Sequence, residues 1–304
     1  MEKYLAIDIG GTDVKYAIID REGHQWVLNK MRTVTTSLAA FVTQLQRLVD
    51  HYQDEISGIA ISVPGRVQHP TDRIDFGGSL PFLNGVCLAD ELTAVVPIVV
   101  ENDGKAATLA ELWHGELKAV NNGLVLVLGT AVGGGLVLNH QLVRGDHDQA
   151  GELSFMTSGS QFTPQLMYGS QGSAVAMIET IAETIHLASR DDGPAVFDAL
   201  TAGNQEALAI FTTFCRRIAT LIQNVQTLVD VHTVVIGGGI AAQPLVTQTI
   251  NTELDQLRLA SPLMAATLSR PHVVTSHYQS RANLYGALYQ LLLTTNAIKV
   301  GQLS

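Results

Sequence analysis

The first twenty residues carry the hydrophobic pattern of two short strands around a double glycine. Residues 4–9 are mostly β-formers, and a second apolar run occupies 14–19, after the turn at Gly10-Gly11. Strand-forming residues on both sides of a short glycine segment predict a strand, a tight turn and a second strand. The chain is therefore expected to open with a β-hairpin.

Further along, the hydrophobic period alternates between that of helices and that of strands. Apolar residues three or four positions apart predict helices over 38–49, 106–113, 174–188, 208–229 and 283–295. Apolar runs that stop at glycine, proline or polar residues predict strands over 58–63, 98–100, 123–128, 136–138 and 233–236. Pro244 fits the first turn of another helix, and the turn-forming residues of 76–85 predict a loop.

The size of the chain indicates two domains. Its 304 residues and hydrophobic share of 46% are enough to build two cores. We expect two α/β domains, the first formed by residues 1–114 with 283–304 and the second by 115–282. The helix over 283–295 has the composition to fold back onto the first domain.

Charge and segment composition restrict the location and the partners. The formal net charge of −10, with no basic cluster, argues against a nucleic-acid or anionic membrane surface. The N-terminal apolar run is too short for a signal peptide, and no run of about 18 apolar residues exists, which predicts a soluble, cytoplasmic protein. Cys87 and Cys215 belong to no C-x-x-C pair, so we expect small buried residues and no disulfide.

The first glycine turn has the residues of a phosphate site. Gly10 and Gly11 let the backbone approach a ligand, Thr12 offers a hydroxyl, and Asp8 offers a carboxylate on the same side. Backbone amides could face phosphate oxygens while Asp8 holds a hydrated divalent cation. An ordinary surface hairpin would use the same glycines, so the motif alone leaves both interpretations open.

Two later glycine turns resemble the first. Residues 123–130 form an apolar run that ends at Gly129-Thr130, and the strand resumes at Leu136 after a turn over 131–135 that includes Gly133. This repeat suggests two related halves, each with a phosphate-binding hairpin, although coincidence between two ordinary hairpins is the alternative. The third turn, Gly237-Gly238-Gly239, follows a strand, and its bare backbone could admit a flat ring such as adenine.

A polar triplet follows the strand that ends near residue 100. Glu101, Asn102 and Asp103 stand at its carboxyl end, where ligands bind in open α/β sheets. Asp103 or Gly104 is a reasonable N-cap for the following helix, whose N-terminus favours an ionised carboxylate. Asp103 is therefore either a reactive carboxylate or only a cap.

Five motifs in this order over nearly the whole chain resemble the ROK family of bacterial sugar kinases. The motifs are D-I-G-G-T-D-V-K from Asp8, E-N-D-G-K-A-A-T-L-A-E from Glu101, G-T-A-V-G-G-G from Gly129, A-G-E from Ala150 and I-G-G-G-I from Ile236. The resemblance implies a two-domain actin-like ATPase (ribonuclease H-like) fold with an interdomain cleft. It also implies ATP and Mg²⁺ as cosubstrate and cofactor, and a homodimer. The first motif begins a few residues from Met1, so the winged helix-turn-helix of family repressors is expected to be absent.

The resemblance also assigns roles to residues. Asp103 matches the catalytic base, while Asn102 and Glu152 match sugar-binding residues, with Gly65 and Phe155 expected beside the sugar. Nucleotide, phosphate or metal contacts are expected from Asp8, Gly10, Gly11, Thr12, Gly129, Thr130, Gly133, Gly237, Gly238 and Gly239. Lys15 aligns with a family lysine that could assist the phosphates, and a solvated strand-edge lysine is the alternative.

One departure from the family pattern concerns zinc and the sugar. Phe155 replaces the family histidine that contacts sugar and ligates zinc, and no cysteine lies between Cys87 and Cys215. We therefore predict no zinc site. Zinc-lacking members with an aromatic residue here include β-glucoside kinases, which residues 76–88 and 142–145 also resemble. An aromatic face suits a pyranose ring or a glycoside.

The sequence thus predicts an ATP-dependent kinase that phosphorylates a hydroxyl, the 6-position, of a glucose-type sugar or β-glucoside. A non-catalytic sugar or nucleotide sensor with a protein partner is the rival from another class, because Phe155 and the missing cysteines resemble erosion of a site. A kinase for fructose, an N-acyl amino sugar or another hexose is the third interpretation. Sugar-stimulated ADP release separates the sensor from the kinases.

Overall fold

The computed structural model describes residues 1–295, and the chain forms two compact units. The first unit contains Met1–Lys118, Gly135–Ala150 and 281–295, and the second contains Ala119–Gly134 and Gly151–Ser280. The segment 135–150, which the sequence-based division assigned to the second domain, groups here with the first. The predicted domain boundaries stay a prediction, and their part over 296–304 lies outside the described residues.

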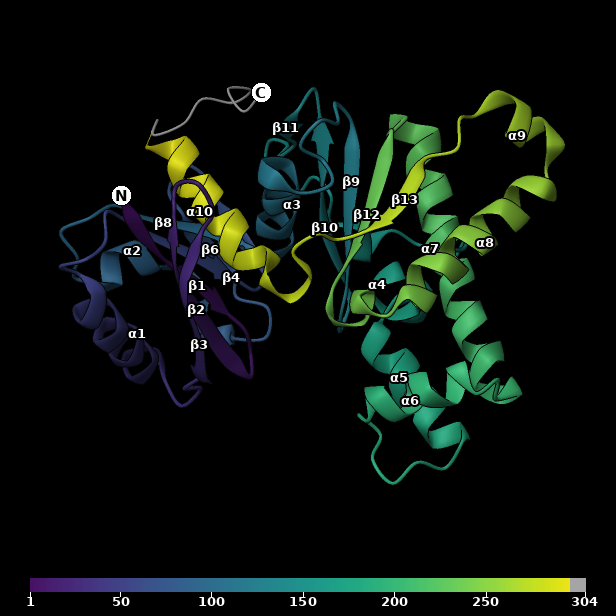
Figure 1. The fold of residues 1–304 in the computed structure, drawn as a ribbon, viewed down its shortest axis with the longest axis horizontal. Helices are drawn as coiled ribbons and strands as arrows, with labels where there is room; N and C mark the ends of the chain where they lie inside the picture. Colours follow the sequence, from purple (N-terminus) through teal and green to yellow (C-terminus); the bar gives the residue numbers. More distant parts are fainter. Residues whose placement is uncertain (296–304) are drawn as a thin grey trace. The chain divides into compact units, whose positions relative to one another are not determined.

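The first unit is built on a five-stranded sheet of order β3-β2-β1-β4-β8 (Figure 1). Its strands are β1 (Lys3–Ile9), β2 (Asp13–Asp20), β3 (Gln25–Arg32), β4 (Ile59–Val63) and β8 (Ile98–Asn102). The first three strands are antiparallel, whereas β4 and β8 run parallel to β1. Asp8 is in register with Ser62, and Ser62 with Glu101, so polar side chains of three parallel strands share one edge of the sheet.

Helices cover both faces of this sheet. Helix α1 (Leu38–Tyr52) packs Phe41 and Leu45 against the odd-numbered apolar residues of β1, and the Ser37 side chain caps its N-terminus. Helices α3 (Asp103–His114) and α10 (Ala282–Thr294) pack against each other, and α10 also contacts β1, β4 and β8. Because Asn283 of α10 bonds Asp8, this helix lies on the opposite face, that of the even-numbered residues.

Glycine sets the distance between α10 and α3. A Cβ atom added at Gly286 would lie 1.6 Å from the carbonyl oxygen of Ala106. Any side chain there would push apart α10, which carries Asn283, and α3, which begins at the predicted site residue Asp103. The helix predicted over 283–295 is confirmed, and its packing onto the first unit follows from this contact.

A small second sheet in the first unit was missed in the sequence. It consists of β5 (Arg66–Gln68), β6 (Arg73–Phe76) and β7 (Val86–Cys87), followed by the short helix α2 (Leu88–Glu91). The loop predicted over 76–85 is confirmed over 77–85 apart from one 3₁₀ turn, Pro81–Leu83, while Phe76 belongs to β6. Strands of two to four residues have too few positions for a period to be recognised.

A second five-stranded sheet has the strand order β11-β10-β9-β12-β13, which repeats the topology of the first sheet. Its strands are β9 (Gly123–Leu128), β10 (Val132–Leu138), β11 (Gln141–Leu142), β12 (Thr233–Gly237) and β13 (His272–Thr275). Strand β12 runs parallel to β9 and β13, and β11 antiparallel to β10. The repeated strand order supports the two related halves suggested by the glycine turns.

The second unit contains six of the ten α-helices found in residues 1–295. These are α4 (Tyr168–Gln171), α5 (Ala174–Thr184), α6 (Gly193–Thr201), α7 (Gln205–Val229), α8 (Pro244–Leu259) and α9 (Pro262–Thr267). The prediction of a helix to residue 188 is wrong, because α5 ends at Thr184 and the Leu187 N–H bonds back to the Ala182 carbonyl. The long helix and the start at Pro244 are confirmed, with Asn204 capping α7. Among residues 1–295, no helix has both the length and the apolar character needed to cross a membrane.

We predict that Gly286→Ala destabilises the protein by about 1–3 kcal/mol, because overpacking at a helix crossing forces backbone shifts. The midpoint of urea-induced unfolding measures the effect. Gly159→Ala is the matched control, since its added methyl would only touch the Leu166 side chain at 3.4 Å. Equal midpoints for the two variants would contradict the proposed close approach.

Candidate active site

Asp8 is a buried carboxylate at the carboxyl end of β1. It accepts hydrogen bonds from the Ser62 hydroxyl at 3.3 Å and the Asn283 amide at 2.9 Å, and Lys15 Nζ lies 3.8 Å away. Burial raises the pKa of Asp8, while the Asn283 bond, the Lys15 charge and the Ser62 bond oppose that rise. Three groups therefore orient this carboxylate and favour its charged form, although the net effect of its surroundings is upward.

The turn after β1 is held from three sides. Gly10 N–H donates to the Asp13 carbonyl at 3.0 Å, and Thr33 donates from its hydroxyl to the Gly10 carbonyl at 2.6 Å. A Cβ atom at Gly11 would lie 3.0 Å from Ser79 Oγ, so the loop after β6 passes close to the turn. Gly11 and Thr12 are exposed. The turn thus presents backbone to solvent in a fixed shape, as a phosphate site requires.

Asn102 and Asp103 form a hydrogen-bonded pair at the start of α3. Asn102 Oδ1 accepts the Lys105 N–H at 2.9 Å, while its Nδ2 donates to the Gly65 carbonyl at 2.5 Å and to Asp103 Oδ1 at 2.9 Å. The same Asp103 oxygen accepts the Gly104 N–H at 2.7 Å. The prediction that Asp103 or Gly104 caps the helix is wrong, since Asn102 has the extended backbone and the capping bond. Asp103 is instead the first helical residue.

Gly65 and the loop after β6 complete this region of the first unit. Gly65 has φ +88°, and an added Cβ atom would lie 1.9 Å from the Phe76 carbonyl oxygen. Only glycine fits such a position. A chain of close approaches therefore runs from Gly11 through the Gly78-Ser79 segment to Gly65 and Asn102. The structure brings together the predicted first-unit residues, from the turn at Gly10, Gly11 and Thr12 to the candidate base Asp103.

The second unit brings together the two remaining glycine turns. Gly129 accepts the Ala174 and Val175 N–H groups, at 2.9 and 3.3 Å, from the start of α5. Gly238, with φ +96°, crosses the end of β9 so closely that a Cβ atom would lie 2.2 Å from the Leu128 carbonyl oxygen. At Gly129 and Gly239 an added Cβ would meet nothing within 4 Å. Bare backbone therefore faces open space at both turns, which fits a cradle for a nucleotide.

Gly134 is the sterically required glycine of the β9–β10 turn, and it was missed in the sequence. Its φ is +147°, and an added Cβ atom would lie 1.9 Å from the Val125 carbonyl oxygen. The predicted Gly133 beside it is exposed, as is Thr130. In a run of three glycines, the sequence does not show which one packs against the neighbouring strand, as Gly134 does, and which one is exposed to solvent, as Gly133 is.

Glu152 and Phe155 lie in the second unit, at the two ends of the segment that forms the 3₁₀ turn Leu153–Phe155. Ser154 Oγ fastens this turn to Val132, accepting its N–H at 3.1 Å and donating to its carbonyl at 2.9 Å. Phe155 is 67% exposed and Glu152 is half-buried. Phe155 thus presents an aromatic face to solvent on an anchored turn.

A buried ion cluster in the first unit was not predicted as such, although residues 101 and 144 both lie in segments that carried the family resemblance. Glu101 accepts from Arg144 Nη2 at 2.5 Å and lies 3.4 Å from His69 Nε2, and His69 Nδ1 lies 2.8 Å from Asp72. Burial alone would raise the pKa of Glu101, but the bond and charge of His69 and Arg144 lower it to about 2. Burial likewise lowers the pKa of His69, but its bonds to Asp72 and Glu101 raise it to about 9.

The donor set of the first unit fits an outer-sphere magnesium site. Asp8 is the buried carboxylate, with the Thr12 hydroxyl on the adjoining turn, and Mg²⁺ keeps several waters when it binds phosphates. Within residues 1–295, no three or more His, Cys, Asp or Glu side chains are grouped to hold a metal directly. The expected lack of zinc stays a prediction.

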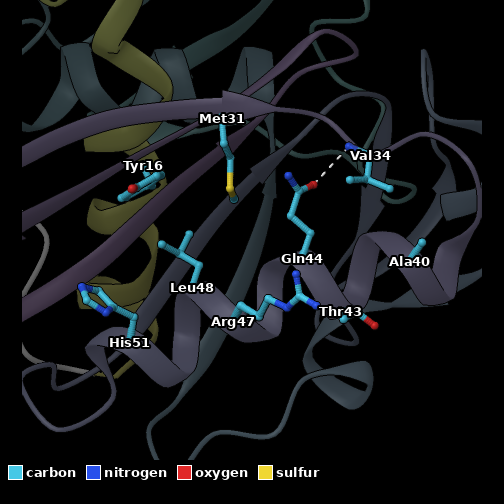
Figure 2. A pocket seen from close by; sticks show the side chains of 9 residues that line it. All are labelled: Tyr16, Met31, Val34, Ala40, Thr43, Gln44, Arg47, Leu48 and His51. Carbon is cyan, nitrogen blue, oxygen red and sulfur yellow. Dashed lines mark hydrogen bonds between the residues drawn. The ribbon is translucent and has the colours of Figure 1, made fainter.

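A surface hollow of the first unit is formed by a different set of residues. It has a volume of about 650 Å³ and lies between β2, β3 and α1 (Figure 2). Tyr16, Met31 and Leu48 contribute apolar surface to it, and Gln44 accepts the Val34 N–H at its edge. None of the predicted site residues lines it.

Comparison with known proteins identifies the class. The ROK family profile matches residues 4–293, and the chain belongs to the ROK family. A beta-glucoside kinase from Listeria innocua is 29% identical over 300 residues, covering 97% of this chain and 99% of the relative. The predicted family and the carbohydrate-kinase class are confirmed.

Solved structures agree on the fold. A ROK family protein from Streptococcus pneumoniae, in complex with sucrose, has a TM-score of 0.87 and 26% identity, covering 97% of this chain and all of that chain. A ROK family glucokinase from Streptomyces griseus, in complex with glucose and AMPPNP, has a TM-score of 0.79 at 22% identity, covering 94% and 97%. The predicted α/β fold of actin-like ATPases is confirmed.

The ion cluster predicts a pH-dependent stability. His69 has a pKa of about 9 in the folded protein against an ordinary 6.5, so the native state binds the extra proton. Its contribution is complete below pH 6.5 and is lost as the pH rises through about 9. We expect the free energy of unfolding, measured with urea, to fall by about 1–2 kcal/mol over that pH range because of this residue. The free energy of unfolding of His69→Gln should depend less on pH. His51→Gln, an exposed residue, should retain the wild-type profile; an unchanged profile in His69→Gln would refute the charged pair.

Proposed function

We propose that this protein transfers the γ-phosphate of ATP to the 6-hydroxyl of a glucose-type sugar or β-glucoside. The observation that carries the proposal is the Asn102–Asp103 pair at the first turn of α3. Asp103 is held there by two hydrogen bonds to one oxygen, at the end of a helix whose dipole favours a negative charge. A carboxylate held in this way can orient a hydroxyl and accept its proton.

The reaction needs little from the protein beyond positioning and one proton acceptor. Asp103 would take the proton of the sugar hydroxyl. As it does so, the hydroxyl oxygen forms a bond to the γ-phosphorus, and the bond between the γ-phosphorus and the leaving ADP oxygen breaks. Asn102 is anchored on Gly65, so it would fix the edge of the sugar next to the reacting hydroxyl. Glu152 would accept hydrogen bonds from other sugar hydroxyls.

The glycine turns would bind the nucleotide. In the first unit, Gly10, Gly11 and Thr12 would face phosphate oxygens with Lys15 nearby, while Asp8 would hold magnesium through water. Magnesium would neutralise phosphate charge. In the second unit, Gly129, Thr130 and Gly133 would face phosphates, and Gly237, Gly238 and Gly239 would lie against the adenine.

Phe155 supports a sugar ring or a glycoside as the substrate. An exposed aromatic face can stack on the apolar face of a pyranose or on the aglycone of a glycoside. The ROK relative from Listeria innocua bears the name beta-glucoside kinase. Another hexose is the second candidate, because only residues around the sugar would differ. We further propose that the enzyme works in the cytoplasm as a homodimer.

A non-catalytic sensor is the weaker candidate. Its support is the phenylalanine at position 155 in place of a polar sugar ligand. A sensor has no need for an oriented carboxylate beside Asn102 together with phosphate turns in both units. A coupled ADP assay over a panel of hexoses and β-glucosides distinguishes the two, since a sensor releases no ADP in response to sugar.

Asp103→Asn should lower sugar-dependent ADP release by roughly 10²–10⁴-fold, the usual contribution of a general base. The amide keeps the size and the two hydrogen bonds at Oδ1, so ATP binding and unfolding temperature should stay near wild type. Asp50→Asn, on the exposed face of α1, is the control and should be fully active. Wild-type turnover in Asp103→Asn would remove this residue from the mechanism.

Phe155→Ala should change substrate preference. Loss of a stacking face worth about 0.5–1.5 kcal/mol predicts a roughly 2–10-fold fall in kcat/KM for an aryl β-glucoside, with a smaller change for glucose. Phe162→Ala removes another exposed ring of the second unit and should leave both values unchanged. Equal effects on the two substrates would argue against stacking on the aglycone.

A further inference from the structure

Glu101 is the meeting point of three segments that are distant in the sequence. It lies at the end of β8, with none of its surface exposed, immediately before Asn102 and Asp103. His69 reaches it from the turn between β5 and β6, and Arg144 from the loop after β11. Glu101 Oε1 also accepts the Asn102 N–H at 2.8 Å. The buried carboxylate is therefore bonded directly to the backbone of the candidate sugar-binding residue.

The partners of Glu101 are themselves fixed. Arg144 donates from Nη2 to Gln290 Oε1 at 3.0 Å, and its Nη1 lies 3.4 Å from Asp148. Asp148 accepts the His69 N–H at 3.0 Å. Asp72 accepts the backbone N–H of Val100 at 3.0 Å. Val100 lies on β8, the edge strand of the sheet, and within residues 1–295 no further strand pairs with the outer side of β8. Each partner is thus tied to a second segment of the first unit.

Helix α10 connects this cluster to Asp8 of β1. Asn283 bonds Asp8 at the end of β1, and Gln290, two helical turns later, bonds Arg144 beside β8. Two helical turns extend about 10 Å, which equals about two strand spacings, the separation of β1 and β8 across β4. One helix therefore fixes both ends of the polar row formed by Asp8, Ser62 and Glu101.

We propose that Arg144, Glu101 and His69 form a positioning triad that holds Asn102 and Asp103 in the geometry required for phosphoryl transfer. This role rests on the proposed function of Asp103. Glu101 is buried in a low-dielectric environment and paired with both cations, so its side chain keeps one position. Its bond to the Asn102 N–H then fixes the main chain at the end of β8. The triad touches neither sugar nor nucleotide in this role. It acts through the Asn102 backbone, where displacements of about 1 Å can cost a hundredfold in rate.

Arg144→Met tests the proposal, with Arg144→Lys as the conservative variant. Arg144→Met should lower kcat for sugar-dependent ADP release at least tenfold with the KM for ATP unchanged, and Arg144→Lys should recover part of the loss. Hydrogen–deuterium exchange of the full-length protein should be faster at the amides of 100–105 in Arg144→Met, and unchanged over 123–128 in the second unit. The matched control is Arg73→Met, which removes an arginine paired with Asp75 at 2.6 Å in the small sheet.

Each outcome decides the proposal. Folded Arg144→Met protein with wild-type kcat and wild-type exchange at 100–105 overturns it, and so does an equal effect from Arg73→Met. If Arg144→Met does not fold, Arg144→Lys decides alone: partial loss of kcat with faster local exchange supports the triad, and wild-type behaviour overturns it. If the wild-type protein releases no ADP with any sugar, the proposed function fails, and exchange at 100–105 then decides whether the triad positions the segment.

Discussion

The architecture of the first unit depends on one constraint: charged groups at the carboxyl ends of buried parallel strands must find partners within the protein. Asp8 and Glu101 are both almost fully buried, and burial disfavours the charged form of each. The sheet supplies only some of their partners, Ser62 and Lys15 for Asp8 and the Asn102 N–H for Glu101. The other partners come from α10, from the turn between β5 and β6 and from the loop after β11.

The two carboxylates are treated differently by their surroundings. Glu101 has two cationic partners, which lower its pKa far enough to keep it charged at any physiological pH. Asp8 has one lysine at 3.8 Å and two neutral donors, and its pKa stays raised. A nearby cation would stabilise the charged form of Asp8, whereas Glu101 needs none. This difference supports the metal-binding role proposed for Asp8 and the positioning role proposed for Glu101.

The glycines of the chain also fall into two groups, according to what occupies the space of the missing side chain. Gly65, Gly134, Gly238 and Gly286 are required because other backbone atoms occupy the space of a side chain. Gly129 and Gly239 instead leave open space where a side chain would be. The first group permits close packing of the chain on itself, and the second leaves backbone accessible to a ligand. The same residue type in the same motif therefore permits close packing at one position and leaves open space beside the backbone at the next.

Local patterns in the sequence were enough to predict the family, the hairpins at the first two glycine turns and the main helices, because these depend on periodicity and on short ordered motifs. They could not show that Asn102, rather than Asp103, caps α3, since either side chain can accept the bond and backbone conformation chooses between them. They also missed Asn283 beside Asp8, and Arg144 and His69 beside Glu101, which are 275, 43 and 32 positions apart. These pairs form only in the folded chain, because folding brings the partners of a buried charge close to it from distant segments. Their positions in the sequence follow no period that could be recognised beforehand.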